Sequence, residues 1–301
     1  MPTTRRGRVV LAEERPRSRA RRRATRVVVA VLAVALIGAG YVGVQGLLRN
    51  LGGPRCQATA VGKSVDFDPS QTRYAATITA VAVKRGLPPR AATIAIATAL
   101  QESKLRNLRY GDRDSVGLFQ QRPSQGWGTE EQILDPVYAV NRFYDALVKI
   151  KGYESMEITK VAQEVQRSAY PEAYADHEQE GRILASTISG HSPAGIGCRL
   201  NAADTGDPVA FAADLKTQLG PSAATPAGRT LQVKADSPLQ AWAIGAWAVS
   251  MADAHGVTQV RVADRQWTRT RDKDGWTWQS AGAGQPAGAD AGETVTVTFA
   301  G

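Results

Sequence analysis

The 301-residue sequence predicts a mostly α-helical domain that follows a single transmembrane helix, with a small α+β domain at the C-terminus. Three observations carry this prediction. An uncharged apolar run near the N-terminus has the length of a membrane-spanning helix. Through the middle of the chain, apolar residues recur at intervals of three or four, which is the periodicity of helices. After residue 230, one helical segment is followed by alternating apolar and polar residues, the pattern of strands.

The N-terminal residues 1–26 form a basic tail. Ten arginines and two glutamates give this tail +8 of the chain's net charge of +9. Because the basicity is confined to a tail, we expect no nucleic-acid partner. Arginine on this flank of an apolar segment predicts that the tail is cytoplasmic.

Residues 27–48, VVVAVLAVALIGAGYVGVQGLL, form the predicted transmembrane helix. As a helix, this uncharged segment covers the roughly 30 Å of a bilayer's hydrocarbon core. A cleaved signal peptide is the alternative, but the run exceeds the usual length of about 7–15 residues and no A-x-A site closes it. The sequence therefore predicts a single-pass protein of the cell membrane with extracytoplasmic C-terminal domains.

Cys56 and Cys198 are the only cysteines. We expect them to form a disulfide, because such bonds persist in the oxidising environment outside the cytoplasm. Two unrelated buried thiols are the alternative. The pair brackets most of the predicted helical domain, residues 55–200. With three histidines and no clustered Cys and His residues, we expect neither a metal nor a cofactor.

Five segments between the cysteines have helical periodicity. They are residues 72–85, 89–106, 135–150, 157–168 and 173–189. Pro89 suits the first turn of a helix, and Asp135 followed by Pro136 is a typical helix start. Residues 201–229 are expected to contain one short helix, opened by Asp-Pro at 207–208, and a linker whose proline and small residues continue to Thr230.

Residues 230–301 form the predicted α+β domain. Residues 237–256 have the pattern of a helix that ends at Gly256, and three later segments alternate as strands. Five tryptophans here either fill a small core, which we favour, or form a ligand platform. They are Trp242, Trp247, Trp267, Trp276 and Trp278. No motif in this domain indicates a ligand. The sequence allows a protein partner for the domain but does not identify one.

Glu102 lies near the end of the second helical segment, and Ala95, Thr98 and Ala99 share its face. Such small side chains leave room for a ligand. An apolar wall disfavours the charged form of a carboxyl group and raises its pKa, which is what a general acid near neutral pH requires. A solvated glutamate at a helix end is the alternative.

The residues after Glu102 form three short motifs. They are Glu102-Ser103, Gly111-Asp112 followed by SVGLFQ at 115–120, and DPVYAVNRFYDAL at 135–147. With these motifs, residues 68–190 resemble the lysozyme-like superfamily, specifically soluble lytic transglycosylases and goose-type lysozymes. In that family the catalytic glutamate lies in a helix-terminal E-S, followed by a G-L-M-Q-like turn and a D-P-x-x-N helix. The motifs of this chain keep the family's order.

The resemblance implies a lysozyme-like domain that cleaves the β-1,4 bond between N-acetylmuramic acid and N-acetylglucosamine in peptidoglycan glycan strands. Glu102 would be the general acid and base. Asp112 and Asp114 follow across a turn and are candidates for a second carboxylate, although aspartate is also common in turns. An inverting hydrolase needs that second acid. A lytic transglycosylase uses one glutamate and forms a 1,6-anhydro product.

The resemblance also implies a sugar-binding cleft after Glu102. Gln120 and the backbone around Gly117 would line it, and four aromatic side chains, one of them Phe119, are candidates to stack on sugar rings. The expected substrate-binding residues are Ser115, Gly117, Gln120, Tyr110, Trp127 and Tyr170, and Phe119 is a further candidate for stacking only. Tyr170 is the candidate for the tyrosine of the family's A-Y-N-x-G block, which residues 161–177 replace.

Two functions follow from the sequence. The first is a membrane-anchored peptidoglycan-cleaving enzyme. The alternative is a non-catalytic lysozyme-like protein that binds the cell wall or serves as a scaffold, as the altered tyrosine block would allow. A transport component is disfavoured, because a single span without an intramembrane charge offers no ion path.

Overall fold

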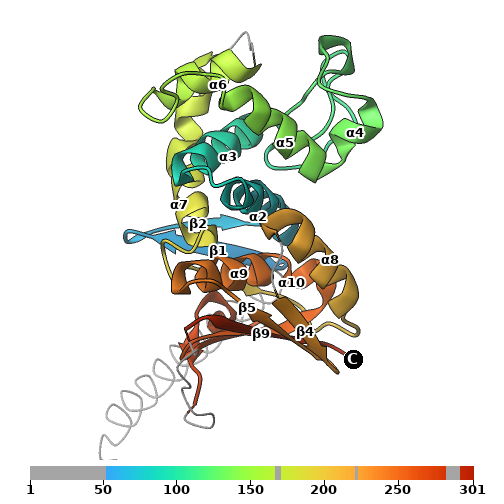
Figure 1. The fold of residues 1–301 in the computed structure, drawn as a ribbon, viewed down its shortest axis with the longest axis vertical. Helices are drawn as coiled ribbons and strands as arrows, with labels where there is room; N and C mark the ends of the chain where they lie inside the picture. The colour runs from blue at the N-terminus through green and yellow to red at the C-terminus, as the bar shows by residue number, and fades with distance from the viewer. Residues whose placement is uncertain (1–51, 167–170, 221–222, 283–291) are drawn as a thin grey trace, which may run out of the picture. The chain divides into compact units, whose positions relative to one another are not determined.

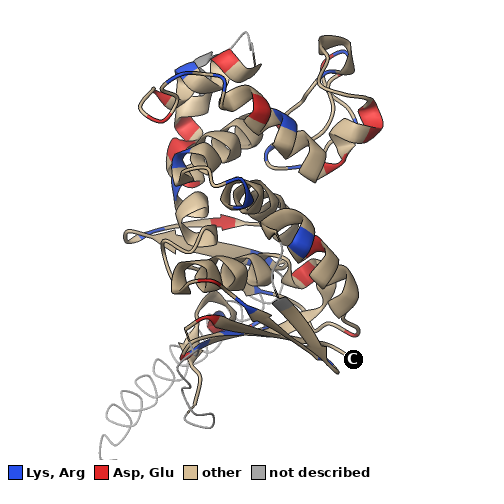
Figure 2. Cartoon of the chain, viewed as in Figure 1, with Lys and Arg blue, Asp and Glu red and all other residues tan. Residues whose placement is uncertain are grey.

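The computed structural model describes residues 52–166, 171–220, 223–282 and 292–301. The predicted basic tail and transmembrane segment lie outside these ranges. None of the helices within them has the length and apolar character to cross a bilayer. Residues Pro54–Gly301 form one compact unit. In Figure 2, the acidic and basic residues of this unit are interspersed along its helices rather than gathered by sign.

The middle of the chain is helical, as the periodicity predicted (Figure 1). Its helices are α2 (Pro69–Lys84), α3 (Pro89–Ser103), α4 (Glu130–Leu134), α5 (Pro136–Leu147), α6 (Ile158–Gln166) and α7 (Glu178–Ile188), with 3-10 turns η1 (Pro123–Gln125) and η2 (Pro171–His177). Asp68 caps α2 in a capping box with Gln71. Asp135 caps α5 ahead of Pro136, which confirms that helix start.

The helices α2 to α7 are called the helical half below. Helix α3 is its central helix, and small residues let α7 pack closely against α3. Gly181 of α7 lies so near that a β-carbon there would be 2.7 Å from the carbonyl oxygen of Thr93. The sequence predicted room for a ligand beside Ala95, Thr98 and Ala99, on the helical face of Glu102. This prediction is wrong, because the three residues are fully buried. Fully buried side chains present no surface to a ligand.

Replacing Gly181 with valine is expected to lower the free energy of unfolding by about 2–3 kcal/mol, because the added atoms would force α7 away from the backbone of α3. Chemical denaturation measures the change. Gln179→Val on the exposed side of the same helix is the control, and it should change stability by less than about 0.5 kcal/mol. Equal stability of the two variants would show that the α3–α7 contact is not tight.

A three-stranded antiparallel sheet adjoins the helices and was not predicted. Its strands are β1 (Arg55–Ala60), β2 (Lys63–Phe67) and β3 (Ile196–Arg199), in the order β2-β1-β3. Val61 and Gly62 join β1 to β2 with φ of 51° and 71°, the geometry of a tight hairpin. Cys56 lies opposite Cys198 in the β1–β3 register, and the two form the expected disulfide.

The C-terminal part contains helices α8 (Pro208–Leu219), α9 (Pro238–Ser250) and α10 (Ala252–His255) and a six-stranded antiparallel sheet. Its strands are β4 (Ala223–Ala227), β5 (Thr230–Lys234), β6 (Val257–Val262), β7 (Arg265–Thr268), β8 (Gln279–Ser280) and β9 (Thr294–Phe299). They lie in the order β4-β5-β9-β6-β7-β8. A 3-10 turn, η3 (Lys273–Trp276), precedes β8. Helix α9 lies on this sheet and also packs against α2, α7 and β3 (Figure 1). It therefore joins the helical half to the sheet.

Two predictions for the C-terminal part have clear outcomes. The predicted linker before Thr230 is wrong for residues 223–227, which form the edge strand β4. An edge position tolerates Pro226, because proline has no N–H to donate there. The core interpretation of the tryptophans is confirmed for Trp247, Trp267 and Trp278, which are buried and donate their indole N–H groups to protein oxygens.

Candidate active site

Glu102 lies one residue before the end of α3, where the chain turns sharply. Lys104 and Leu105 both adopt left-handed backbone angles, with φ of 56° and 55°. Ser103 holds the turn, because its Oγ donates to the carbonyl oxygen of Leu118 at 2.7 Å and accepts from the N–H of Arg106 at 3.2 Å. The serine of the E-S motif thus ties the helix end to the loop that follows.

The Glu102 carboxyl group is partly buried and has two side-chain partners. Tyr174 donates its hydroxyl to Oε1 at 2.6 Å, and the Gln166 side chain also hydrogen-bonds to the carboxyl group. Gln166 Nε2 donates to the carbonyl oxygen of Phe119 at 2.6 Å, which fixes its amide. Burial raises the pKa of Glu102 and outweighs the two hydrogen bonds, which lower it. A carboxyl group of this kind keeps its proton to a higher pH than an ordinary glutamate does.

Tyr174 was missed by the sequence analysis. Tyr170, the predicted tyrosine, lies outside the described residues. Tyr174 belongs to η2 and is fully buried. The signal was present, since both tyrosines occur in the replaced block four residues apart. Spacing alone did not select between them, because the residues before α7 form a 3-10 turn and do not follow the α-helical period.

The loop after Glu102 folds back on itself. Gln120, at a left-handed φ of 48°, donates its side-chain amide to the carbonyl oxygens of Tyr110 and Gly117, both at 3.3 Å. Gly117 lies against α4, and a β-carbon there would be 2.8 Å from the carbonyl oxygen of Ile133. Ser115 is buried in the same loop. These predicted binding residues therefore contribute to the shape of the loop, and their contact with a sugar stays a prediction.

The two candidate second carboxylates have different surroundings. Asp112 is 91% exposed at its side chain. Asp114 accepts from Arg122 Nε at 2.7 Å and from the N–H of Ser124 at 2.8 Å, and these hydrogen bonds hold its pKa well below the usual range. Asp114 thereby fixes the turn that leads into η1. Among the hydrogen bonds of the described residues, none joins either aspartate to Glu102.

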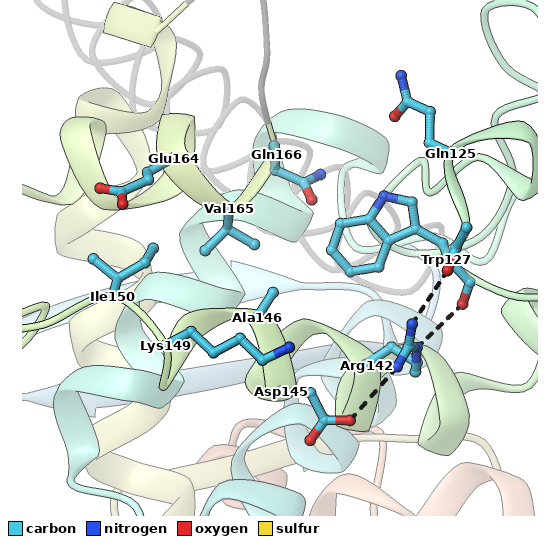
Figure 3. A pocket seen from close by; sticks show the side chains of 11 residues that line it. Gln125, Trp127, Arg142, Asp145, Ala146, Lys149, Ile150, Glu164, Val165 and Gln166 are labelled. Carbon is cyan, nitrogen blue, oxygen red and sulfur yellow. Dashed lines mark hydrogen bonds and ion pairs between the residues drawn. The ribbon is translucent and has the colours of Figure 1, made fainter.

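A pocket of about 470 Å³ lies between the loop at 125–127 and the helices α5 and α6 (Figure 3). It is lined by Gln125, Gly126, Trp127, Arg142, Asp145, Ala146, Lys149, Ile150, Glu164, Val165 and Gln166. Gln166 both lines this pocket and bonds to Glu102, so this residue connects the pocket to the candidate acid, which is not itself among the lining residues. Its volume lies within the range of about 300–1,000 Å³ that is typical of ligand sites.

The predicted aromatic residues fall into different environments. Trp127 lines the pocket, and Figure 3 shows its indole facing Gln166. Tyr110 is 73% exposed. Phe119 is fully buried and stacks on Phe143 with ring centroids 4.5 Å apart, so the expectation that it stacks on a sugar is wrong. Trp127 is the aromatic residue that the structure brings to the pocket.

Among the described residues, no group of three or more His, Cys, Asp or Glu side chains is arranged to hold a metal ion. No protein-family model matches the chain, and no curated protein sequence matches it. The function is therefore inferred from the geometry around Glu102.

Proposed function

We propose that this protein is a membrane-anchored extracytoplasmic enzyme that cleaves peptidoglycan glycan strands, with Glu102 as its general acid and base. The observation that carries the proposal is the setting of Glu102. Its carboxyl group is partly buried at the end of a core helix and accepts hydrogen bonds from Tyr174 and from Gln166, which lines a pocket of ligand size.

The proposed reaction begins with protonation of the glycosidic oxygen by Glu102 as the sugar gains oxocarbenium character. The raised pKa of Glu102 keeps the proton available at a pH where an ordinary glutamate is ionised. Once the proton is transferred, Tyr174 stabilises the carboxylate through its hydroxyl. Glu102 then takes a proton from the nucleophile that completes the reaction.

The surroundings of the two aspartates support a single-acid mechanism. An inverting hydrolase needs a free carboxylate about 6.5–9.5 Å from the acid to activate water. Asp114 is instead engaged with Arg122 and Ser124, and Asp112 is directed to solvent. In a lytic transglycosylase the nucleophile is the muramoyl 6-hydroxyl, and Glu102 alone serves as acid and then base. We therefore propose the 1,6-anhydro product.

The cellular location is part of the proposal. The Cys56–Cys198 disulfide supports an oxidising compartment for the described residues. The sequence of residues 27–48 supports a membrane anchor. Together they would place the catalytic unit next to the cell wall.

Tyr174→Phe is expected to move the alkaline limb of the pH–rate profile to higher pH. The tyrosine hydrogen bond lowers the pKa of Glu102, so its removal raises that pKa further and keeps the acid protonated at higher pH. Loss of the bond to the carboxylate should also reduce kcat about tenfold. Tyr153→Phe, at another buried tyrosine, is the control and should leave the profile unchanged. A Tyr174→Phe profile identical to that of wild type would exclude this role.

The test of the function is release of soluble glycan fragments when the full chain is incubated with purified cell wall. A second candidate is a non-catalytic wall-binding or scaffolding protein. It is favoured by the loop residues Gln120 and Gly117, whose polar groups are engaged within the loop itself. Sedimentation of the protein with insoluble wall and no released fragments would support that candidate, whereas neither binding nor release would exclude both.

A further inference from the structure

Gln166 is the last residue of α6, and the sequence analysis did not select it. One side of α6 packs against α3 and α5. The residues of this side are buried and recur at the spacing of a helix face: Ile158, Val161, Ala162 and Val165. Because this face fixes α6 on the core, the partly exposed side chain of Gln166 is brought to the C-terminal end of α3, where Glu102 lies.

The side-chain amide of Gln166 has a defined orientation. Its Nε2 lies 2.6 Å from the carbonyl oxygen of Phe119. Since a carbonyl oxygen can only accept, the nitrogen of the amide and not its oxygen faces Phe119. Phe119 is itself fully buried and stacks on Phe143. The amide of Gln166 is therefore held by an acceptor that belongs to the packed core.

Gln166 also donates to Glu102. Their hydrogen bond lowers the pKa of Glu102, which means that the amide favours the ionised carboxylate. A carboxylate only accepts, and Nε2 carries the hydrogens of the amide. One NH₂ group thus bridges the Phe119 carbonyl oxygen and the Glu102 carboxylate.

The carboxylate of Glu102 has a second donor on another element. Tyr174 of η2 donates its hydroxyl to Oε1 at 2.6 Å. The last torsion of a glutamate side chain is broad, so a single donor would leave the carboxyl group free to turn. Donors from α6 and from η2 together restrict that rotation.

We propose that Gln166 is a positioning residue for Glu102: its NH₂ group ties the Glu102 carboxylate to the carbonyl oxygen of Phe119 and so fixes it relative to the loop after α3. The tie itself follows from the hydrogen bonds, and its effect on cleavage rests on the proposed function. A general acid is efficient only when its carboxyl group is aimed at the oxygen that it protonates. Gln166 therefore acts through Glu102 and not on the sugar.

Carboxyl-carbon NMR of the full chain, labelled at glutamate, tests the tie without turnover. The Glu102 resonance is the one that Glu102→Gln lacks. Gln166→Met has a side chain of similar length but no donor, so the Glu102 resonance should titrate at higher pH than in wild type. Gln166→Glu keeps the shape and should shift the titration in the same direction, because adjacent carboxyl groups disfavour ionisation. Gln232→Met, the same change at an exposed position on β5, is the control and should titrate like wild type.

Kinetics of fragment release separate positioning from binding and from folding. Gln166→Met should lower kcat about tenfold and leave KM for soluble glycan strands unchanged. The alkaline limb of its pH–rate profile should move to higher pH together with the Glu102 titration. A residue that served only the fold would lower the unfolding temperature and leave the titration and the pH profile unchanged.

A Glu102 resonance that titrates as in wild type in both Gln166 variants would overturn the inference. A protein that cleaves wall but shows this result retains the proposed function and loses the positioning role of Gln166. A protein in which the titration shifts as expected but which releases no fragments from wall retains the tie to Glu102 and loses the enzymatic function.

Discussion

Replacing Glu102 with glutamine is expected to abolish release of soluble fragments from purified cell wall, with a fall in rate of at least about 10³-fold. Glutamine keeps the size of the side chain but can neither give a proton to the glycosidic oxygen nor take one from the nucleophile. Removal of one general acid–base group typically costs 10²–10⁴-fold, and in the proposed mechanism the same group acts in both steps. The rate of fragment release under identical conditions measures the effect.

The same variant should fold at least as stably as wild type at neutral pH. A carboxyl group whose pKa is higher in the folded than in the unfolded state destabilises the fold once the pH rises through the folded value. Burial raises the pKa of Glu102, so a neutral amide removes that cost. Thermal unfolding at pH 7.5 would show this. Glu131→Gln, an exposed substitution on α4, is the activity control and should cleave like wild type. Wild-type cleavage by Glu102→Gln would exclude Glu102 as the acid.

Replacing both cysteines with serine is expected to lower the free energy of unfolding by about 2–5 kcal/mol. The disulfide joins residues 142 positions apart, so its loss frees a long loop in the unfolded chain. In the folded protein the bond pairs β1 with β3, and β3 packs against α9. The largest loss of order should therefore occur where the helical half meets the C-terminal sheet.

Denaturant unfolding with and without a reducing agent measures this effect. Reduced wild type should match the Cys56→Ser/Cys198→Ser variant, and the variant should not respond to the reductant. Ser189→Ala, at a buried serine away from the bond, is a control that should keep the response of wild type to reduction. Equal unfolding midpoints for oxidised and reduced wild type would show that the disulfide does not stabilise the fold.

Much of the helical half could be predicted from the sequence, because its elements combine a strong apolar period with clear end signals. Asp135 followed by Pro136 identified the start of α5, and the segment that begins at Pro89 became α3. The disulfide followed from cysteine number and topology. Glu102 could be selected because an ionisable residue near the end of an apolar helix is unusual, and the structure places it in a partly buried setting.

Other features depend on contacts distant in sequence and escaped prediction. Strands β1 to β3 are short, and pairing of β1 with β3 joins residues near 56 to residues near 198. Strand β4 consists of alanines, a threonine and Pro226, a composition typical of a linker. These residues form a strand only because they lie at the edge of the sheet, where a proline needs no N–H to donate. Tyr174 reaches Glu102 only because η2 packs against α3. The small residues of α3 beside Glu102 resembled open space in the sequence, but they are fully buried in the folded protein.

The central claim is that Glu102 catalyses cleavage of the glycan strand, and mass spectrometry of purified cell wall digested by the full chain tests it most directly. We predict glycan fragments that end in 1,6-anhydromuramoyl groups from wild type and none from Glu102→Gln. Wall left intact by wild type, or the same fragments from both proteins, would contradict the claim.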